Sequence, residues 1–173
     1  AERGNTAKGL GGPTDQRLMR RLQNAADGIV VGAGTIRAGN IIYDPDRWRI
    51  TLSRTGKLPL DNPFFVDAPG KAIVFCSGLI ASEDLIRLKS FCQVRIVGET
   101  EIDIAAILQI AKSELGINRL LLEGGPDLNA AFLRSGMIDE FFLTLAPKLK
   151  GGRDLPTVID GVSLPGRDTL GLE

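Results

Sequence analysis

The sequence contains no histidine, and its only two cysteines are Cys76 and Cys92. The lack of histidine excludes Ser-His-Asp catalysis, Cys-His catalysis and histidine-bound metals within this sequence. Two cysteines are too few for a disulfide framework or a cysteine-rich zinc site, so we expect no metal site. Because each cysteine lies beside apolar residues, we interpret both as buried, unreactive thiols. The chemistry must therefore come from carboxylates, lysines, hydroxyls, backbone groups or a bound cofactor.

Neither sign of charge is in excess, because 21 lysines and arginines balance 21 aspartates and glutamates. A balanced chain argues against nucleic acid or an anionic membrane as a partner. The sequence also lacks the ~18 consecutive apolar residues of a membrane span, and no signal peptide opens it. We therefore expect a soluble, cytoplasmic protein. At 173 residues, the chain has the length of one domain.

The apolar pattern alternates between strands and helices along the chain. We expect strands at 28–32, 72–76, 94–97, 119–123 and 141–146, a strand remnant at 51–53, and helices that begin near residues 14, 82, 104 and 127. Ser82 and Asp103 are suitable N-caps for two of these helices. Strands that alternate with helices of about ten residues predict an α/β domain of three layers, with a mostly parallel central sheet between helices. In such sheets, ligands bind beyond the carboxyl ends of the strands, near a switch in strand order.

The first strand runs directly into a glycine-rich segment that contains Gly32, Gly34, Thr35 and Arg37. Because glycine has no Cβ atom, backbone amides in this segment can approach a ligand closely. Thr35 adds a hydroxyl and Arg37 a cation, and both suit a phosphate or a ribose. The alternative is a tight turn in which the glycines only supply positive φ angles.

A second strand end carries the sequence Glu123-Gly124-Gly125-Pro126-Asp127-Leu128. Pro126 suits the first position of a helix, and the free N–H groups at that helix start would form an anion site for a pyrophosphate. Asp127 partly offsets this site unless it contacts a ribose hydroxyl. Glu123 closes a run of leucines, so its carboxylate must reach solvent, a hydrogen-bond donor or a ligand. The alternative for Glu123 is an exposed strand terminus.

Neither segment matches the usual dinucleotide fingerprint, and the absence of a G-x-x-x-x-G-K-[ST] motif argues against P-loop phosphoryl transfer. Two glycine-bearing strand ends in one small domain favour an extended nucleotide over a single phosphate. A dinucleotide cofactor would also explain how a chain without histidine performs chemistry, since the cofactor carries the reaction.

Two groups of apolar residues have alternative interpretations. Tyr43 and Trp48 could stack on a heterocycle, although such residues more often pack a loop against the core. The strand expected at 141–146 is apolar on both sides. This pattern agrees with one face in the core and the other in a subunit contact.

Three ordered motifs resemble the riboflavin-biosynthesis pyrimidine reductase family: VVGAGTIRA at 30–38, LEGGPDL at 122–128, and MIDE with APKLKGG at 137–152. This family includes the C-terminal reductase domain of the bifunctional bacterial deaminase/reductase, and its fold is dihydrofolate-reductase-like. The resemblance implies a single reductase domain over residues 1–173, usually in a homodimer. It also implies NADPH-dependent reduction of 5-amino-6-(5-phosphoribosylamino)uracil, in which the ribosyl group becomes ribityl.

By position, the resemblance implies that Glu123 is the catalytic contact to the substrate and that Thr35 contacts NADP. The segment that begins at Gly125 would surround the pyrophosphate, and Arg37 or Arg54 would suit the 2′-phosphate that distinguishes NADPH. The full set of expected cofactor contacts is Gly32, Gly34, Thr35, Arg37, Gly39, Ser53, Arg54, Val97, Gly124, Gly125, Pro126, Asp127 and Leu128.

The sequence also departs from the family pattern. Gly39 stands where the family usually has an acidic residue, and the stretch near Ile50 is short. The family's opening and closing strands have no counterpart, so we expect the intact protein to contain further segments. Lys148 is a candidate for the substrate phosphate or a solvated surface charge. Two alternatives remain open: a dihydrofolate or pterin reductase of the same fold, and a non-catalytic nucleotide-binding module.

Overall fold

The computed structural model of the protein describes residues 11–148 and 157–161, and the parts of the expected features at 1–10 and 149–152 lie outside these residues. The strands are β1 (Gly28–Gly32), β2 (Trp48–Leu52), β3 (Ala72–Cys76), β4 (Gln93–Ile96) and β5 (Leu120–Leu122). The helices are α1 (Pro13–Ala25), α2 (Ala33–Ala38), α3 (Pro63–Val66), α4 (Ser82–Lys89), α5 (Ile104–Ser113) and α6 (Pro126–Arg134), and η2 (Pro69–Lys71) is a single 3-10 turn.

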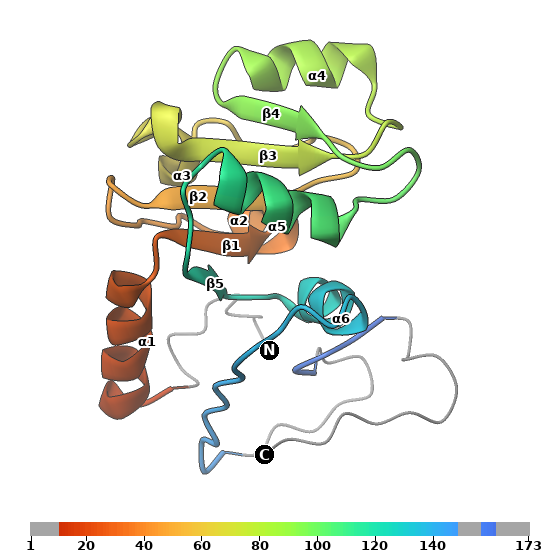
Figure 1. Cartoon of the computed structure of the whole chain (residues 1–173). Coiled ribbons are helices and arrows are strands. Elements are labelled where there is room, and N and C mark those ends of the chain that lie inside the picture. The colour runs from red at the N-terminus through yellow and green to blue at the C-terminus, as the bar shows by residue number, and fades with distance from the viewer. Residues whose placement is uncertain (1–10, 149–156, 162–173) are drawn as a thin grey trace.

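The strands form one parallel sheet in the order β4-β3-β2-β1-β5. Successive strands from β1 to β4 are added toward one edge, and β5 then returns to pair with the other side of β1 (Figure 1). The switch in strand order therefore lies between β1 and β5. In open parallel sheets, this is the place where ligands bind, at the carboxyl ends of the strands.

Apolar clusters cover both faces of the sheet. One cluster packs α2, α3 and α4 against a face that includes Ile29 and Val31. The other packs α5 and α6 against the opposite face, which includes Val30, Ile50 and Ile73. Side chains alternate between the faces of a strand, so β1 is an unbroken apolar run because both of its faces are covered. The three-layer, dihydrofolate-reductase-like α/β fold is confirmed, and every described strand pair is parallel.

The prediction of a strand at 141–146 is wrong. These residues form no strand, and Phe142, Leu143 and Leu145 are 52%, 54% and 85% exposed. A strand needs a neighbouring strand to take up its backbone hydrogen bonds, and none of the strands in the described ranges pairs with this segment. The apolar side chains of this segment therefore lie at the surface rather than in the sheet.

Smaller differences concern the ends of elements. β2 begins at Trp48, earlier than the strand remnant expected at 51–53. The sequence pattern did not predict this start, because Arg49 and Thr51 are polar residues that are fully buried inside the strand. The N-cap of α4 is Ala81 rather than Ser82, which is the first helical residue. The expected cap of α5 is confirmed, since the Asp103 side chain accepts a hydrogen bond from the Ala106 amide at 3.1 Å.

Both cysteines are free thiols, and Cys76 is buried as expected, whereas Cys92 is only half-buried. Burial raises the pKa of the Cys76 thiol to about 11 and that of Cys92 to about 12, with the neighbouring Cys76 adding to the shift of Cys92. Both groups therefore remain protonated at neutral pH, which makes them poor nucleophiles.

None of the helices in the described part of the chain combines the length and the apolar character that crossing a membrane requires.

Candidate functional site

A cleft of about 760 Å³ opens at the carboxyl ends of β1 and β2 and is bounded on one side by α6. Its walls come from residues 32–37 after β1, residues 52–55 after β2, residues 101–104 before α5, and one face of α6. The start of α6 directly follows β5, so the cleft lies at the switch in strand order. A volume of this size is within the range of small-molecule and cofactor sites, which is roughly 300–1,000 Å³.

Most of the residues expected to contact a cofactor line this cleft. They are Gly32, Gly34, Thr35, Arg37, Ser53, Arg54, Gly125, Pro126, Asp127 and Leu128. Gly39, Val97, Gly124 and Glu123 do not line it. The fold thus brings the two glycine-bearing strand ends, which are far apart in the sequence, to the same cleft.

Gly32 and Gly124 join these two strand ends directly. The Gly32 amide donates a hydrogen bond to the Gly124 carbonyl at 2.7 Å, and the Glu123 amide donates to the Val30 carbonyl at 2.9 Å. A Cβ atom at Gly32 would lie 3.2 Å from the Gly125 nitrogen, which is too close for an ordinary contact. Gly124 has a φ of 76°, and its peptide bond to Gly125 is cis. The junction therefore requires glycine on both sides.

The segment after β1 is a helix rather than a glycine turn. Gly32 is the N-cap of α2 with a φ of −67°, and Gly34 lies within the helix, so neither glycine supplies a positive φ. The tight-turn alternative is therefore wrong. A Cβ atom at Gly34 or at Gly125 would meet no other atom within 4 Å, so each of these glycines faces open space beside the cleft.

The amino-terminal end of α6 borders the cleft. Pro126 occupies the first helical position as expected. The N-cap residue before it, Gly125, has no side chain that could accept a hydrogen bond from the first amides of the helix. The first amides of a helix without a side-chain cap are available to water or a ligand, and the helix dipole favours an anion there. Asp127 in the first turn carries the opposing charge.

The charged side chains that line the cleft are three arginines and two carboxylates. Arg37, Arg54 and Arg134 outnumber Glu101 and Asp127. Arginine binds phosphate with two parallel hydrogen bonds, so a surplus of arginine suits a phosphorylated ligand. The side chains and backbone of the cleft thus suit a ligand that carries phosphate.

The carboxylate of Glu123 lies outside the cleft and is held by two partners that the sequence did not reveal. Tyr43 Oη donates a hydrogen bond to Glu123 Oε2 at 2.5 Å, and Gln23 Nε2 donates to Oε1 at 2.6 Å. Tyr43 belongs to the apolar cluster on the α2–α4 face, and burial, followed by the nearby Glu123 charge, raises the pKa of its hydroxyl. Glu123 is therefore a half-buried, hydrogen-bonded group rather than an exposed strand terminus.

Comparison with known protein families shows where this chain belongs. A family model described as the RibD C-terminal domain matches residues 1–171. This chain belongs to that family.

The chain is similar to curated reductases and RibD proteins from several organisms. A 2,5-diamino-6-ribosylamino-4(3H)-pyrimidinone 5′-phosphate reductase from Methanothermobacter thermautotrophicus is 30% identical over 167 residues, which are 88% of this chain and 74% of that protein. The riboflavin biosynthesis protein RibD of Actinobacillus pleuropneumoniae is 27% identical over 90% of this chain and 43% of that protein.

Solved structures support the fold of this chain. A pyrimidine reductase-like protein from Corynebacterium diphtheriae superposes with a TM-score of 0.75 at 23% identity, over 92% of this chain and 74% of that one. The riboflavin biosynthesis reductase of Saccharomyces cerevisiae gives a TM-score of 0.60 at 23% identity, over 75% of this chain and 62% of that one.

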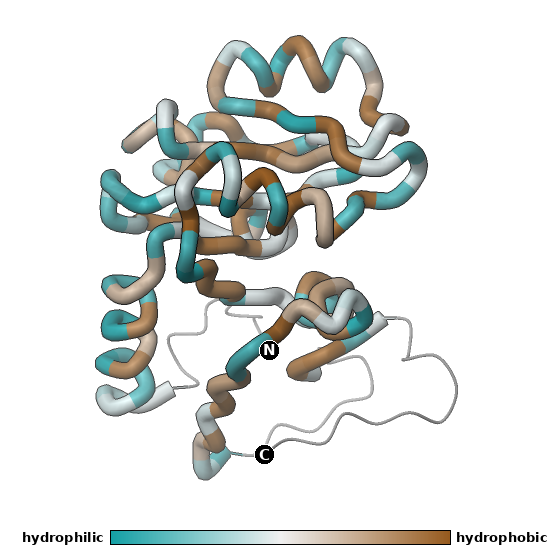
Figure 2. The backbone as a smooth tube through the Cα atoms, in the orientation of Figure 1, coloured by the Kyte–Doolittle hydropathy of each residue, from teal (hydrophilic) through white to brown (hydrophobic). Residues whose placement is uncertain are grey.

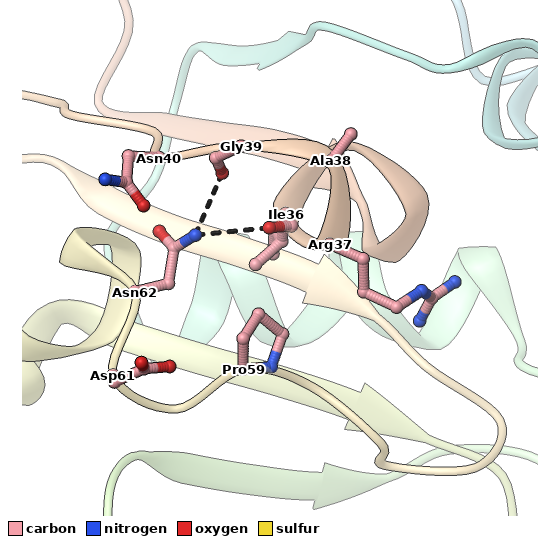
Figure 3. Close-up of a pocket in the computed structure, with 8 residues that line it drawn as sticks. All are labelled: Ile36, Arg37, Ala38, Gly39, Asn40, Pro59, Asp61 and Asn62. Carbon is pink, nitrogen blue, oxygen red and sulfur yellow. Dashed lines mark hydrogen bonds between the residues drawn. The ribbon is translucent and has the colours of Figure 1, made fainter. Parts of the chain in front are cut away.

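Of the three expected cofactor contacts that do not line the cleft, Gly124 lies in the junction with Gly32, and Val97 and Gly39 lie elsewhere. Val97 is buried in the cluster beneath α5, where its amide donates to the Cys76 carbonyl. Gly39 lines a separate hollow of about 200 Å³ (Figure 3). There, Asn62 Nδ2 donates to the carbonyls of Ile36 and Gly39, at 3.1 and 2.9 Å, so the amide side chain holds the end of α2 in place.

Trp48 packs within the fold and does not line the cleft. Its indole Nε1 donates to the Leu115 carbonyl at 3.1 Å, and the Lys71 ammonium lies 4.7 Å from the ring centroid. Trp48 therefore packs β2 against the chain after α5, as expected for most aromatic residues in such a position.

Several cleft residues were missed by the sequence reasoning. Thr55, Glu101, Ile102, Ala131 and Arg134 all line it. Ala131 and Arg134 lie four and seven residues after Asp127, so the helical spacing of α6 could have indicated them. Glu101 and Ile102 precede α5 and carry no local signal for a ligand.

Proposed function

We propose that this chain is an NADPH-dependent reductase of a 6-ribosylaminopyrimidine 5′-phosphate in riboflavin biosynthesis. The first substrate to test is 2,5-diamino-6-ribosylamino-4(3H)-pyrimidinone 5′-phosphate, after which the relative from Methanothermobacter thermautotrophicus is named. The second is 5-amino-6-(5-phosphoribosylamino)uracil, which the family resemblance implies. The observation that carries the proposal is the arginine-lined cleft at the β1/β5 switch, where two glycines leave room beside the backbone.

The cofactor assignment rests on the residues of the cleft. The first turn of α6 would hold the pyrophosphate, Thr35 would contact a sugar hydroxyl or a phosphate, and Asp127 would contact a ribose hydroxyl. Arg54 or Arg37 would bind the 2′-phosphate. The hydride for the reduction comes from NADPH when it is bound.

The residues of this chain contribute mainly by positioning the substrate. The acceptor is the C1′ carbon of the ribosylamine in its open-chain imine form, and reduction of this carbon gives the ribityl product. A well-oriented near-attack geometry can lower a barrier by ~7–11 kcal/mol. Glu123 would hold polar groups of the substrate through its half-buried carboxylate.

We also propose that residues 1–173 act as a single reductase domain within a homodimer. An apolar, exposed segment that includes Met137, Phe141, Phe142, Leu143 and Leu145 supports a subunit contact after α6. Monomers rarely expose a large contiguous apolar patch without an interaction to cover it.

A titration of the purified chain with NADPH and with NADH, followed by protein fluorescence, tests the cofactor. We expect NADPH to bind at least tenfold more tightly than NADH. Failure of both nucleotides to bind would contradict the proposal.

Consumption of NADPH in the presence of each candidate substrate then tests the reaction. We expect turnover with one or both of the ribosylaminopyrimidine phosphates and none with dihydrofolate. Turnover with dihydrofolate alone would indicate a pterin reductase, and tight NADPH binding without turnover of any pyrimidine or pterin would indicate a nucleotide-binding module.

A further inference from the structure

Three segments that are distant in the sequence converge on the Glu123 carboxylate. Tyr43 comes from the loop after α2, Gln23 from the last turns of α1, and Glu123 from the residue after β5. Each carboxylate oxygen accepts one short hydrogen bond, at 2.5 Å from the Tyr43 hydroxyl and 2.6 Å from the Gln23 amide. Bonds to an ionised acceptor are shorter and stronger than neutral ones. The two donors together fix the rotation of the carboxylate.

These two bonds do not use the full acceptor capacity of Glu123. A carboxylate offers about four lone-pair sites, so two remain after Tyr43 and Gln23 have bonded. An ionised carboxylate has no proton to donate. The group that meets the remaining sites must therefore carry an N–H or an O–H, as the amino groups and sugar hydroxyls of a ribosylaminopyrimidine do.

Tyr43 is itself held rigidly. Its side chain is only 8% exposed and lies in the apolar cluster with Ile29 and Val31. Its carbonyl accepts a hydrogen bond of 3.4 Å from Arg49 Nη2, and Arg49, which is fully buried in β2, also bonds the carbonyls of Pro63 and Phe64. Because burial raises the pKa of the Tyr43 hydroxyl, this group remains a donor throughout the neutral and mildly alkaline range.

We propose that Tyr43 is a positioning residue: together with Gln23, it orients the Glu123 carboxylate so that its free lone pairs accept hydrogen bonds from N–H or O–H groups of the pyrimidine substrate. This inference rests on the proposed function. Tyr43 acts through Glu123 and does not take part in the transfer of hydride.

The variant Tyr43→Phe tests the proposal, because it keeps the ring in the core and removes only the hydroxyl. We expect kcat for the ribosylaminopyrimidine phosphate to fall about tenfold, while the Kd for NADPH changes less than twofold. Unchanged kcat and KM for the pyrimidine in an active, folded variant would overturn the proposal. Absence of turnover in the unmodified protein would instead count against the proposed function.

A double-mutant cycle distinguishes action through Glu123 from a general effect on the fold. Tyr43→Phe combined with Glu123→Gln is expected to be no slower than Glu123→Gln alone, because residues that act as a unit are not additive. Additive losses of kcat would show that Tyr43 acts independently of Glu123 and would contradict the inference.

Trp48→Phe is the matched control, since it also removes a single hydrogen-bond donor from an aromatic side chain, at a site remote from Glu123. We expect this variant to retain the kcat of the unmodified protein. If Tyr43→Phe fails to fold, Gln23→Met provides the same cycle with Glu123→Gln from a half-buried position on α1. Additivity in that cycle would overturn the proposal equally.

Discussion

Gly125 leaves room in the cleft because it has no side chain, and its backbone conformation is ordinary. Its φ is −69°, which any residue adopts, and a Cβ atom there would meet no protein atom within 4 Å. Gly32 differs, because a Cβ atom there would press on the backbone of the β5–α6 junction, 3.2 Å from the Gly125 nitrogen. The two glycines thus have different effects: Gly32 permits close packing of the backbone, and Gly125 leaves open space in the cleft.

This difference leads to a prediction for Gly125→Ala. The added methyl group occupies space that we assign to NADPH, and overpacking of this kind costs about 1–3 kcal/mol. We expect the Kd for NADPH, measured by fluorescence titration, to rise at least tenfold while the Tm stays within about 2 °C. Gly70→Ala is the control, because a Cβ at Gly70 also meets nothing within 4 Å but lies outside the cleft. Equal NADPH affinity in both variants would contradict the assignment.

Arg54 provides a prediction on cofactor preference. Its exposed side chain lines the cleft after β2, where we place the 2′-phosphate. We expect Arg54→Ala to weaken NADPH binding about tenfold and to leave NADH binding unchanged, as measured by parallel titrations. Lys89→Ala, which removes the same charge from the surface of α4, serves as the control. Equal losses of affinity for NADPH and NADH would indicate that another residue contacts the 2′-phosphate.

At the scale of elements, Asp27 connects the start of β1 to the start of β5. Its carboxylate Oδ2 accepts hydrogen bonds from the amides of Asn118 and Arg119, both at 2.9 Å. These bonds, with Arg119 the larger contributor, lower the pKa of Asp27. The pairing of β5 with the rest of the sheet is therefore assisted by a side chain as well as by the short β1–β5 ladder.

The lowered pKa of Asp27 predicts a pH-dependent contribution to stability. A carboxyl group whose pKa is lower in the folded state stabilises that state above its unfolded pKa of about 3.9, and this contribution is lost as the pH falls through the folded value. We expect Asp27→Asn to reduce the free energy of unfolding at pH 7 by about 1 kcal/mol, because the bonds are partly open to solvent. Urea unfolding at pH 7 and at acidic pH measures this difference, which should shrink on acidification. A constant difference would contradict the assignment.

The sequence predicted the four longer helices and the covered strands well, but it missed the short helices α2 and α3 and part of β2. The apolar runs at 28–32 and 72–76 are strands at the expected residues, because both faces of each are buried. β2 was seen only in part, since no local pattern announces that Arg49 is fully buried and bonds three backbone carbonyls. The error at 141–146 has the opposite cause, because these apolar residues pair with none of the strands within residues 11–148 and 157–161.

The candidate site could be predicted where the chain backbone itself forms it. Gly34 and Gly125 were identifiable because both follow strands of a parallel sheet, and ligands bind at the carboxyl ends of such strands. The partners of Glu123 were not identifiable. Tyr43 and Gln23 lie 80 and 100 residues away in the sequence, and only the fold brings their donors to the carboxylate.

At the scale of the whole molecule, apolar side chains gather in two places. Figure 2 shows them in the central strands and again along the extended segment that follows α6. The second group is exposed, and Leu145 is its most exposed member. Burial of such a surface in a subunit contact would stabilise the assembly by roughly 25 cal/mol per Å² of apolar area.

The homodimer can be tested by charging this surface. We expect the double variant Phe142→Asp with Leu145→Asp to sediment as a monomer in analytical ultracentrifugation, while the unmodified chain sediments as a dimer. Ile86→Asp, which changes an apolar residue on α4 that is 71% exposed, is the control and should remain dimeric. A monomeric unmodified chain, or dissociation of the Ile86→Asp variant alone, would contradict the proposed contact.

The junction of Gly32 with Gly124 also determines when the cleft can exist during synthesis. Strands β1 to β4 emerge from the ribosome in the order in which they pair, but β5 and α6, which complete the hollow, are made after all of them. A nascent chain that stops at Arg119 therefore has most of the sheet but lacks the α6 wall of the cleft. Because a ligand stabilises only the state that binds it, the NADPH that we propose as the cofactor would stabilise finished molecules and not truncated ones.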